Sequence, residues 1–225
     1  MPLTLDHPES LAVASRAALA RLATLSWMED FYLAGSAALA LYTGHRPIQE
    51  LDLMAGTERL ASASRRDRLA DLLGLDPATT VETARDGYLF VRFGPVAVRF
   101  HYYPYPLIAP PEELAGVAVA AAEDLGLMKL GAIISRGTLR DFVDLYLLCR
   151  RLPLAELLAT AGEKFGHVRD FPLQALKGLA DWSATAGEPM PRLASPLERR
   201  EVETWARSAV RELAPFTVAA GETIA

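Results

Sequence analysis

Four prolines close together separate two parts of this chain whose apolar residues follow different spacings. They are Pro104, Pro106, Pro110 and Pro111. Before them, short apolar runs alternate with helical stretches, whereas after them the long apolar segments all have helical spacing. Because proline interrupts both helices and strand ladders, we place a boundary here. We predict an α+β fold, with an α/β core over 1–108 and a helical domain over 109–225.

The spacing of apolar residues predicts the individual elements. Before the prolines, helices are expected over 11–25, 36–42 and 65–73. Strands are expected over 31–34, 51–54, 88–93 and 96–103, the last two as a hairpin around Gly94-Pro95. After the prolines, helices are expected over 123–135, 138–150, 154–164, 173–182 and 197–213.

Composition excludes several classes of protein. Of the 225 residues 51% are hydrophobic and 23% charged, which is typical of a folded chain. No apolar run reaches the roughly 18 residues of a membrane helix, and Asp6 and Glu9 do not fit a secretory leader. Cys149 is the only cysteine, so no internal disulfide forms. The net charge of −5 disfavours a strongly basic nucleic-acid binder. We expect a cytoplasmic protein with no membrane partner.

Gly35 and Ser36 are the first candidate site residues. They follow an expected strand and open an expected helix, where glycine permits close approach and helix-start amides suit a phosphate oxygen. A simple turn with an N-cap serine has the same pattern. The sequence contains no Gly-rich dinucleotide fingerprint, P-loop or nucleophile elbow.

Glu50 and Asp52 form a second candidate. Two residues apart on a strand, they project to the same face, and paired carboxylates suit Mg²⁺ together with phosphate oxygens. A solvated strand edge is the alternative. His45 and Arg46, just upstream, either reach a phosphate or pair with these acids.

Lys129 is the one cation in a largely apolar stretch of helix. It either extends to water, binds a phosphate in a cleft, or forms a buried ion pair. Asp141 and Asp144 follow on the next expected helix, spaced to share a face, and Asp144 lies between apolar neighbours. A buried ion pair of Asp144 with Lys129 or Arg136 therefore stays an alternative to a role in chemistry.

The order of these motifs resembles AbiEii-type nucleotidyltransferases over roughly 28–150. The first signature comprises a strand, Gly35-Ser36, Ala38-Leu39, Gly44-His45-Arg46 and Glu50-Leu51-Asp52-Leu53. The second signature comprises Leu125 to Ile133, with Lys129, and Arg136 to Tyr146, with Asp141 and Asp144.

The resemblance implies a polymerase-β-type nucleotidyltransferase mixed sheet with flanking helices, followed by a helical C-terminal half. It implies transfer of a nucleotide from an NTP, with Mg²⁺ or Mn²⁺, to an RNA such as tRNA or to a protein hydroxyl. Members include toxins of type IV toxin–antitoxin and phage-defence systems, so a cognate antitoxin is an expected partner.

The same resemblance assigns roles by position. Glu50 and Asp52 would bind the metal, and Gly35, Ser36, Arg46 and Lys129 the nucleotide phosphates. Asp141 and Asp144 would complete the second signature.

The chain departs from the family pattern in its acids. Glu50 stands where aspartate is usual, and the strand expected over 96–103 carries Arg99 and His101 but no third carboxylate. Asp141 or Asp144 would then substitute for it. A catalytically degenerate nucleotide-binding or protein-interaction module on the same fold is the alternative to an active enzyme.

An RNA acceptor would need a basic surface, and two clusters are candidates. One is Arg65, Arg66 and Arg68, and the other is Arg200, Arg207 and Arg211. Each cluster has acidic neighbours, so a solvated helix face explains them as well.

Overall fold

The computed structural model describes residues 3–221 and divides into two compact units. We call them the sheet unit, which ends at Ala121, and the helical unit, which begins at Ala122. The boundary lies after Ala121 rather than after Ile108, because the residues that follow the prolines first add two more strands to the sheet.

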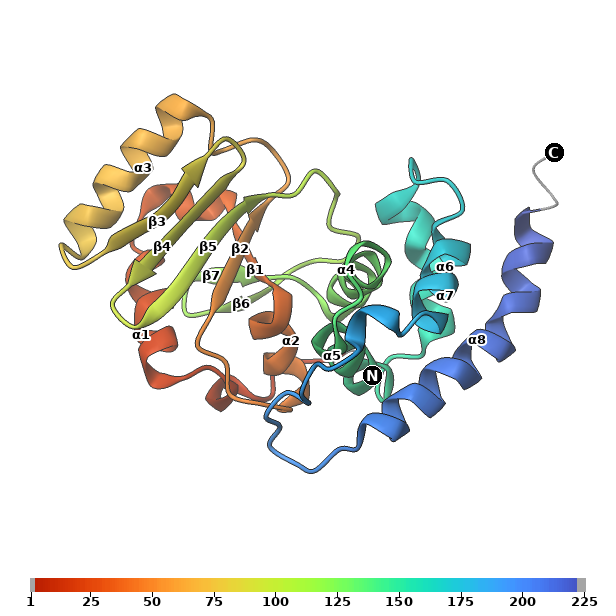
Figure 1. Cartoon of the computed structure of the whole chain (residues 1–225). Coiled ribbons are helices and arrows are strands. Elements are labelled where there is room, and N and C mark those ends of the chain that lie inside the picture. Colours follow the sequence, from red (N-terminus) through yellow and green to blue (C-terminus); the bar gives the residue numbers. More distant parts are fainter. Residues whose placement is uncertain (1–2, 222–225) are drawn as a thin grey trace. The chain divides into compact units, whose positions relative to one another are not determined.

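A seven-stranded mixed sheet forms the centre of the sheet unit (Figure 1). Its strand order is β3-β4-β5-β2-β1-β7-β6. β2 runs parallel to β5 and antiparallel to β1, and β1 runs parallel to β7. The strands are β1 (Tyr32–Ala34), β2 (Leu51–Ala55), β3 (Thr80–Arg85), β4 (Tyr88–Phe93), β5 (Val96–Tyr102), β6 (Glu112–Leu114) and β7 (Val117–Val119). The predicted α+β class with a mixed sheet is confirmed.

Alternation along the strands separates a buried face of the sheet from a more open one. In β2 Leu51 and Leu53 are fully buried, whereas Asp52 between them is partly exposed. In β5 Val98 and Phe100 are fully buried, whereas Arg99 is partly exposed. The helices of this unit are α1 (Val13–Leu22), α2 (Gly35–Thr43) and α3 (Ser62–Leu75), with short 3₁₀ turns at Pro8–Ser10 and Ser26–Asp30. Polar side chains therefore collect on the open face.

Three strands are absent from the sequence-based prediction. All six residues of β3 are exposed, so no alternation marks it. β6 and β7 have three residues each and are joined by Ala115-Gly116, both with positive φ, as a tight hairpin turn requires. Strands this short leave almost no periodic signal.

The helical unit contains the five expected helices (Figure 1). They are α4 (Ala122–Ser135), α5 (Leu139–Cys149), α6 (Leu154–Phe165), α7 (Phe171–Ala180) and α8 (Arg199–Gly221), with a 3₁₀ turn at Ser183–Thr185. α4 packs against α5, α6 and α7, and α8 packs against α7 and α5. Within the described residues, no helix combines the length and the apolar character that crossing a membrane requires.

Candidate active site

The acid pair lies on the open face of the sheet, where β2 begins. In the strand register Asp52 stands opposite Ala34 of β1 on one side and opposite Arg99 of β5 on the other. The side chains of Glu50 and Asp52 are 48% and 25% exposed. The pair is therefore reachable from solvent, as a site for a soluble substrate must be.

Arg99 bridges the two acids. Its Nη1 lies 2.9 Å from Oε2 of Glu50 and 3.6 Å from Oδ1 of Asp52. Nε2 of His101 lies 3.6 Å from the same Asp52 oxygen. Burial disfavours the charged guanidinium, but the hydrogen bond to Glu50 and the charges of Glu50 and Asp52 outweigh it and raise the pKa of Arg99. A permanent positive charge thus lies between the carboxylates.

Gly35 allows Asp52 to approach the start of α2. Its φ is +63°, and a Cβ added there would lie 2.7 Å from Oδ2 of Asp52, a distance at which something must shift. The backbone that opens α2 therefore borders the acid directly. The N-cap of α2 is Ala34, which has no side-chain cap hydrogen bond, and Ser36 lies in the first turn. Ser36 is thus not the N-cap residue that the simpler interpretation expects.

The Gly44-His45-Arg46 segment forms a hydrogen-bonded loop between α2 and β2. Nε of Arg46 donates to Nε2 of His45 over 3.2 Å, so the other ring nitrogen carries the proton. That nitrogen lies 2.6 Å from the Thr43 hydroxyl, which itself donates to the carbonyl of Leu39. The His45 ring is buried. These hydrogen bonds hold Arg46 in the loop that precedes β2.

The donor set fits one divalent ion. Mg²⁺ usually takes one or two carboxylates and completes its shell with substrate phosphates and water, which Glu50 and Asp52 can satisfy. No group of three or more His, Cys, Asp or Glu side chains that could hold a metal occurs within residues 3–221. Glu50 and Asp52 could thus supply the carboxylate ligands of such an ion.

In the helical unit the second signature forms a buried charge cluster. Nζ of Lys129 lies 3.1 Å from Oδ1 of Asp141 and 2.7 Å from Oδ2 of Asp144. Asp141 also accepts hydrogen bonds from Arg136, at 2.8 Å, and from Thr138, at 2.6 Å. All three members of the Lys129 cluster (Lys129, Asp141, Asp144) are buried. This is the buried ion pair that the sequence left as an alternative.

The surroundings of Asp141 stabilise its charged form. Burial alone would raise its pKa, but the hydrogen bonds from Arg136 and Thr138 and the charge of Lys129 lower it to about 2. A second buried pair, Lys164 with Asp124 at 2.6 Å, lies between α6 and α4. Sequence reasoning missed it, although a lysine within the apolar face of 154–164 is the same signal that singled out Lys129.

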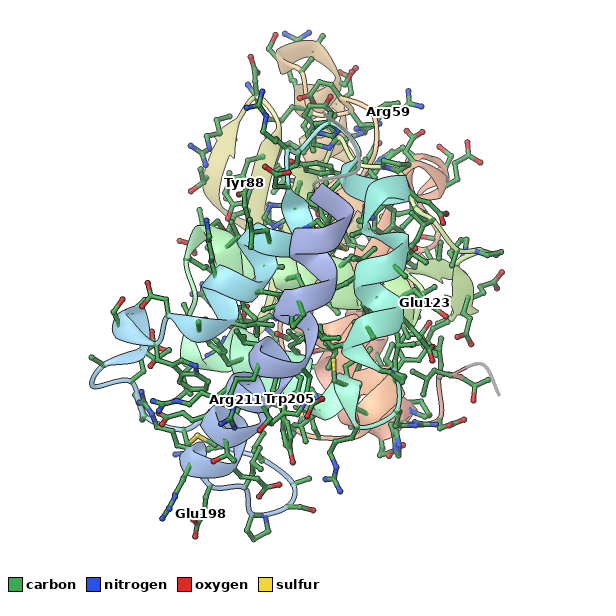
Figure 2. All side chains as sticks on the ribbon, turned by 90° about the vertical axis from the view of Figure 1, so that its right-hand side faces the viewer. Arg59, Tyr88, Glu123, Glu198, Trp205 and Arg211 are labelled. Carbon is green, nitrogen blue, oxygen red and sulfur yellow. The ribbon has the colours of Figure 1, made fainter. Side chains whose placement is uncertain are left out.

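The two basic clusters do not form uninterrupted positive surfaces within their units. Arg65 pairs with Asp86 at 2.6 Å, and Arg68 is buried against Asp30 at 2.9 Å. The exposed arginines at and along α8 have exposed acids near them, namely Glu198, Glu201 and Glu212; Figure 2 shows Arg211 on this helix and Glu198 ahead of its first turn. Arg66, Arg200, Arg207 and Arg211 are exposed, as the solvated-face alternative expects, whereas Arg68 is buried.

Comparisons with known proteins identify the family and the fold of this chain. A model of the family described as "Nucleotidyl transferase AbiEii toxin, Type IV TA system" matches residues 17–217. An uncharacterised protein of Aquifex aeolicus (strain VF5) is 32% identical over 162 residues, which cover 70% of this chain and 77% of that protein.

Solved structures share the fold at low sequence identity. JHP933 from Helicobacter pylori has a TM-score of 0.52 at 16% identity and covers 97% of both chains. A second H. pylori structure, described as a "putative nucleotidyltransferase", has a TM-score of 0.51 at 16% identity and covers 89% of this chain and 93% of that one. Since the family model spans most of the sequence, the chain belongs to the AbiEii nucleotidyltransferase toxin family.

Proposed function

We propose that this chain transfers a nucleotide from an NTP to a hydroxyl of an RNA such as tRNA, and that it acts as a toxin controlled by a cognate antitoxin. Membership of the AbiEii family supports nucleotidyl transfer as its chemistry. The observation that carries the proposal is the position of Asp52, whose carboxylate lies next to Gly35 at the start of α2. An acid in contact with helix-start backbone suits a metal-bound phosphate.

Each residue of the sheet unit then has a defined task. Glu50 and Asp52 hold one Mg²⁺ or Mn²⁺, which neutralises charge on the triphosphate when bound. Gly35 and Ser36 offer backbone amides and a hydroxyl to phosphate oxygens, and Arg46 adds a guanidinium. Phosphoryl transfer needs in-line positioning and neutralised charge more than a covalent catalyst, which is what these groups supply.

In the helical unit we propose Lys129 as a phosphate ligand that Asp141 and Asp144 hold in position. Lys129 already pairs with both Asp141 and Asp144, so a test has to distinguish phosphate binding from a purely structural role. The double variant Lys129→Met/Asp144→Asn removes one charge of each sign and leaves Asp141 with Arg136. Normal folding without nucleotide transfer would support the phosphate role; normal folding with normal transfer would contradict it.

A non-catalytic nucleotide-binding module is the second candidate. The observation that favours it is the ion pair of Glu50 with Arg99, which engages one of the two proposed metal ligands.

Incubation with each α-³²P-labelled NTP, Mg²⁺ or Mn²⁺, total RNA and lysate protein tests these proposals. The matched variants are Asp52→Asn and Glu82→Gln, the latter an exposed acid of the same sheet paired with Arg92. We expect a labelled tRNA band with the wild type and Glu82→Gln, and none with Asp52→Asn. A labelled protein band would contradict the RNA acceptor. Mg²⁺-dependent NTP binding without any labelling would establish the binding module instead.

A further inference from the structure

Arg99 occupies the position of β5 beside Asp52, where a third carboxylate would lie next to the acid pair. The strand register puts it directly opposite Asp52, with Phe100 of β5 turned to the buried face. The next residue of β5 on the same face, His101, also faces Asp52. Both side chains offer nitrogen groups, and Mg²⁺ is a hard cation that takes oxygen ligands. β5 therefore contributes no carboxylate beside Asp52.

The charge balance around the acid pair allows one divalent ion more readily than two. Glu50 and Asp52 together carry two negative charges, and Arg99, only 2.9 Å from Glu50, already offsets one of them. A second dication would lie near a permanent guanidinium charge and would lack an oxygen ligand from β5. Repulsion between charges a few ångströms apart is substantial near a protein surface.

The position of Arg99 is fixed by more than its acids. Its guanidinium lies 4.8 Å from the centre of the Phe90 ring on the neighbouring strand β4. A cation–π contact of this kind helps to hold the guanidinium in position even when its carboxylate partners bind another cation. The guanidinium, with several donors in one plane, then presents charge to phosphate oxygens as well as to carboxylates.

We propose that the acid pair, Glu50 and Asp52, binds a single divalent ion, and that Arg99 supplies a further positive charge to the triphosphate. The inference rests on the proposed nucleotide-binding function. It predicts that Arg99 competes with the divalent ion for the acids before the nucleotide binds, and contacts the phosphates afterwards.

Mn²⁺ titration followed by electron paramagnetic resonance tests the number of ions without requiring turnover. The protein is titrated in the presence of the α,β-methylene analogues of ATP, CTP, GTP and UTP in turn. We expect one bound Mn²⁺ per wild-type protein, with no spin coupling. Arg99→Asp supplies the missing carboxylate, and we expect two coupled ions at the roughly 3.5–4 Å typical of two-metal sites. Two coupled ions in the wild type would overturn the proposal.

A control separates this effect from a general change of charge. Arg92 lies on β4 and pairs with Glu82 rather than with the acid pair. Arg92→Asp should keep one Mn²⁺. If it also binds two, the second ion does not depend on the position opposite Asp52, and the proposal fails.

Titrations without nucleotide test whether Arg99 and the divalent ion compete for the acid pair. They give an answer even if the proposed nucleotide transfer is wrong. Arg99→Gln removes the charge while keeping a similar shape, so Mn²⁺ should bind on the order of tenfold more tightly than to the wild type. Equal or weaker binding would contradict the competition. If no analogue binds, nucleotide transfer is refuted, and the nucleotide-free affinities still test Arg99.

Discussion

Two clusters in this chain each combine a pair of carboxylates with a cation, but they differ in their access to water. At the acid pair, the side chains of Glu50 and Asp52 are 48% and 25% exposed and share one arginine. In the Lys129 cluster, the side chains of Asp141 and Asp144 are 1% and 0% exposed. One cluster is open and the other is closed.

The difference teaches what each cluster can do. Exposed ion pairs contribute little to stability because water and salt screen them, so the acid pair can exchange its cation at small cost. Removing one partner of a buried pair leaves a charge without compensation and is strongly destabilising. We therefore expect substitutions in the closed clusters to affect folding first, and substitutions at the open acid pair to affect ligand binding first.

The largest effect on stability should follow loss of the lysine from the fully buried Lys164–Asp124 pair. Lys164→Met should lower the free energy of unfolding by about 3–5 kcal/mol, because Asp124 is left buried and charged. Urea unfolding followed by Trp182 and Trp205 fluorescence, in a Trp27→Phe background, reports on the helical unit. Lys177→Met, at an exposed lysine of α7, should change the free energy little. Equal effects of the two substitutions would show that burial of the Lys164–Asp124 pair does not increase the cost of losing its lysine.

The second largest loss of stability should occur at low pH, in the closed Lys129 cluster. The folded-state pKa of Asp141 is lowered from 3.8 to about 2, so its contribution is present above pH 4 and is lost as the pH falls towards 2. The loss should be on the order of 2 kcal/mol. Urea titrations of the same background from pH 5 to pH 2.5 measure it. Asp141→Asn should lack this component, and an identical pH profile in that variant would contradict the assignment.

A smaller loss of stability is expected when a side chain is added at Gly35, beside Asp52. Gly35→Ala places a Cβ 2.7 Å from Oδ2 of Asp52 at a φ of +63°, and we expect a cost of about 1–2 kcal/mol. Trp27, in the sheet unit, follows unfolding by fluorescence. Gly56→Ala is the matched control, because nothing lies within 4 Å of its added Cβ. NTP-dependent labelling should fall at least tenfold in Gly35→Ala alone; unchanged labelling would separate Gly35 from the site.

Asp52→Asn should have the smallest effect on stability. Its contacts with Arg99 and His101 are both 3.6 Å long and partly exposed, so the free energy of unfolding should change by less than about 1 kcal/mol. Labelling, by contrast, should be lost. A large loss of stability would show that Asp52 is structural and that the two clusters are alike.

Some of this architecture could be predicted from sequence because it depends on local patterns. The strand expected over 51–54 is present, and in it Asp52 lies between the buried Leu51 and Leu53. β3 lacks alternation, and its signal was the Asp86-Gly87 turn, where Gly87 has a φ of +73°. A two-residue turn of this kind predicts a hairpin partner for β4, which the apolar pattern alone did not.

The parts of the site that escaped prediction depend on contacts distant in sequence. From the sequence, Arg99 was noted only because it stands in a strand that lacks a third carboxylate. Its position opposite Asp52 follows from the parallel register of β2 and β5. The register is set by burial on the other face of the sheet rather than by either residue. Likewise, the apolar context of Lys129 suggested an unusual cation, but only the packing of α4 against α5 shows which carboxylates hold it.

The two outer strands of the sheet carry a consequence for solubility. β3 at one end is exposed throughout and carries Glu82 and Arg85, and β6 at the other end carries Glu112 and Glu113. Unpaired strand edges invite edge-to-edge association between molecules, and charged side chains there oppose it. Because both edge strands are short and carry charged side chains, edge-to-edge association of the sheet with another molecule is opposed on both sides.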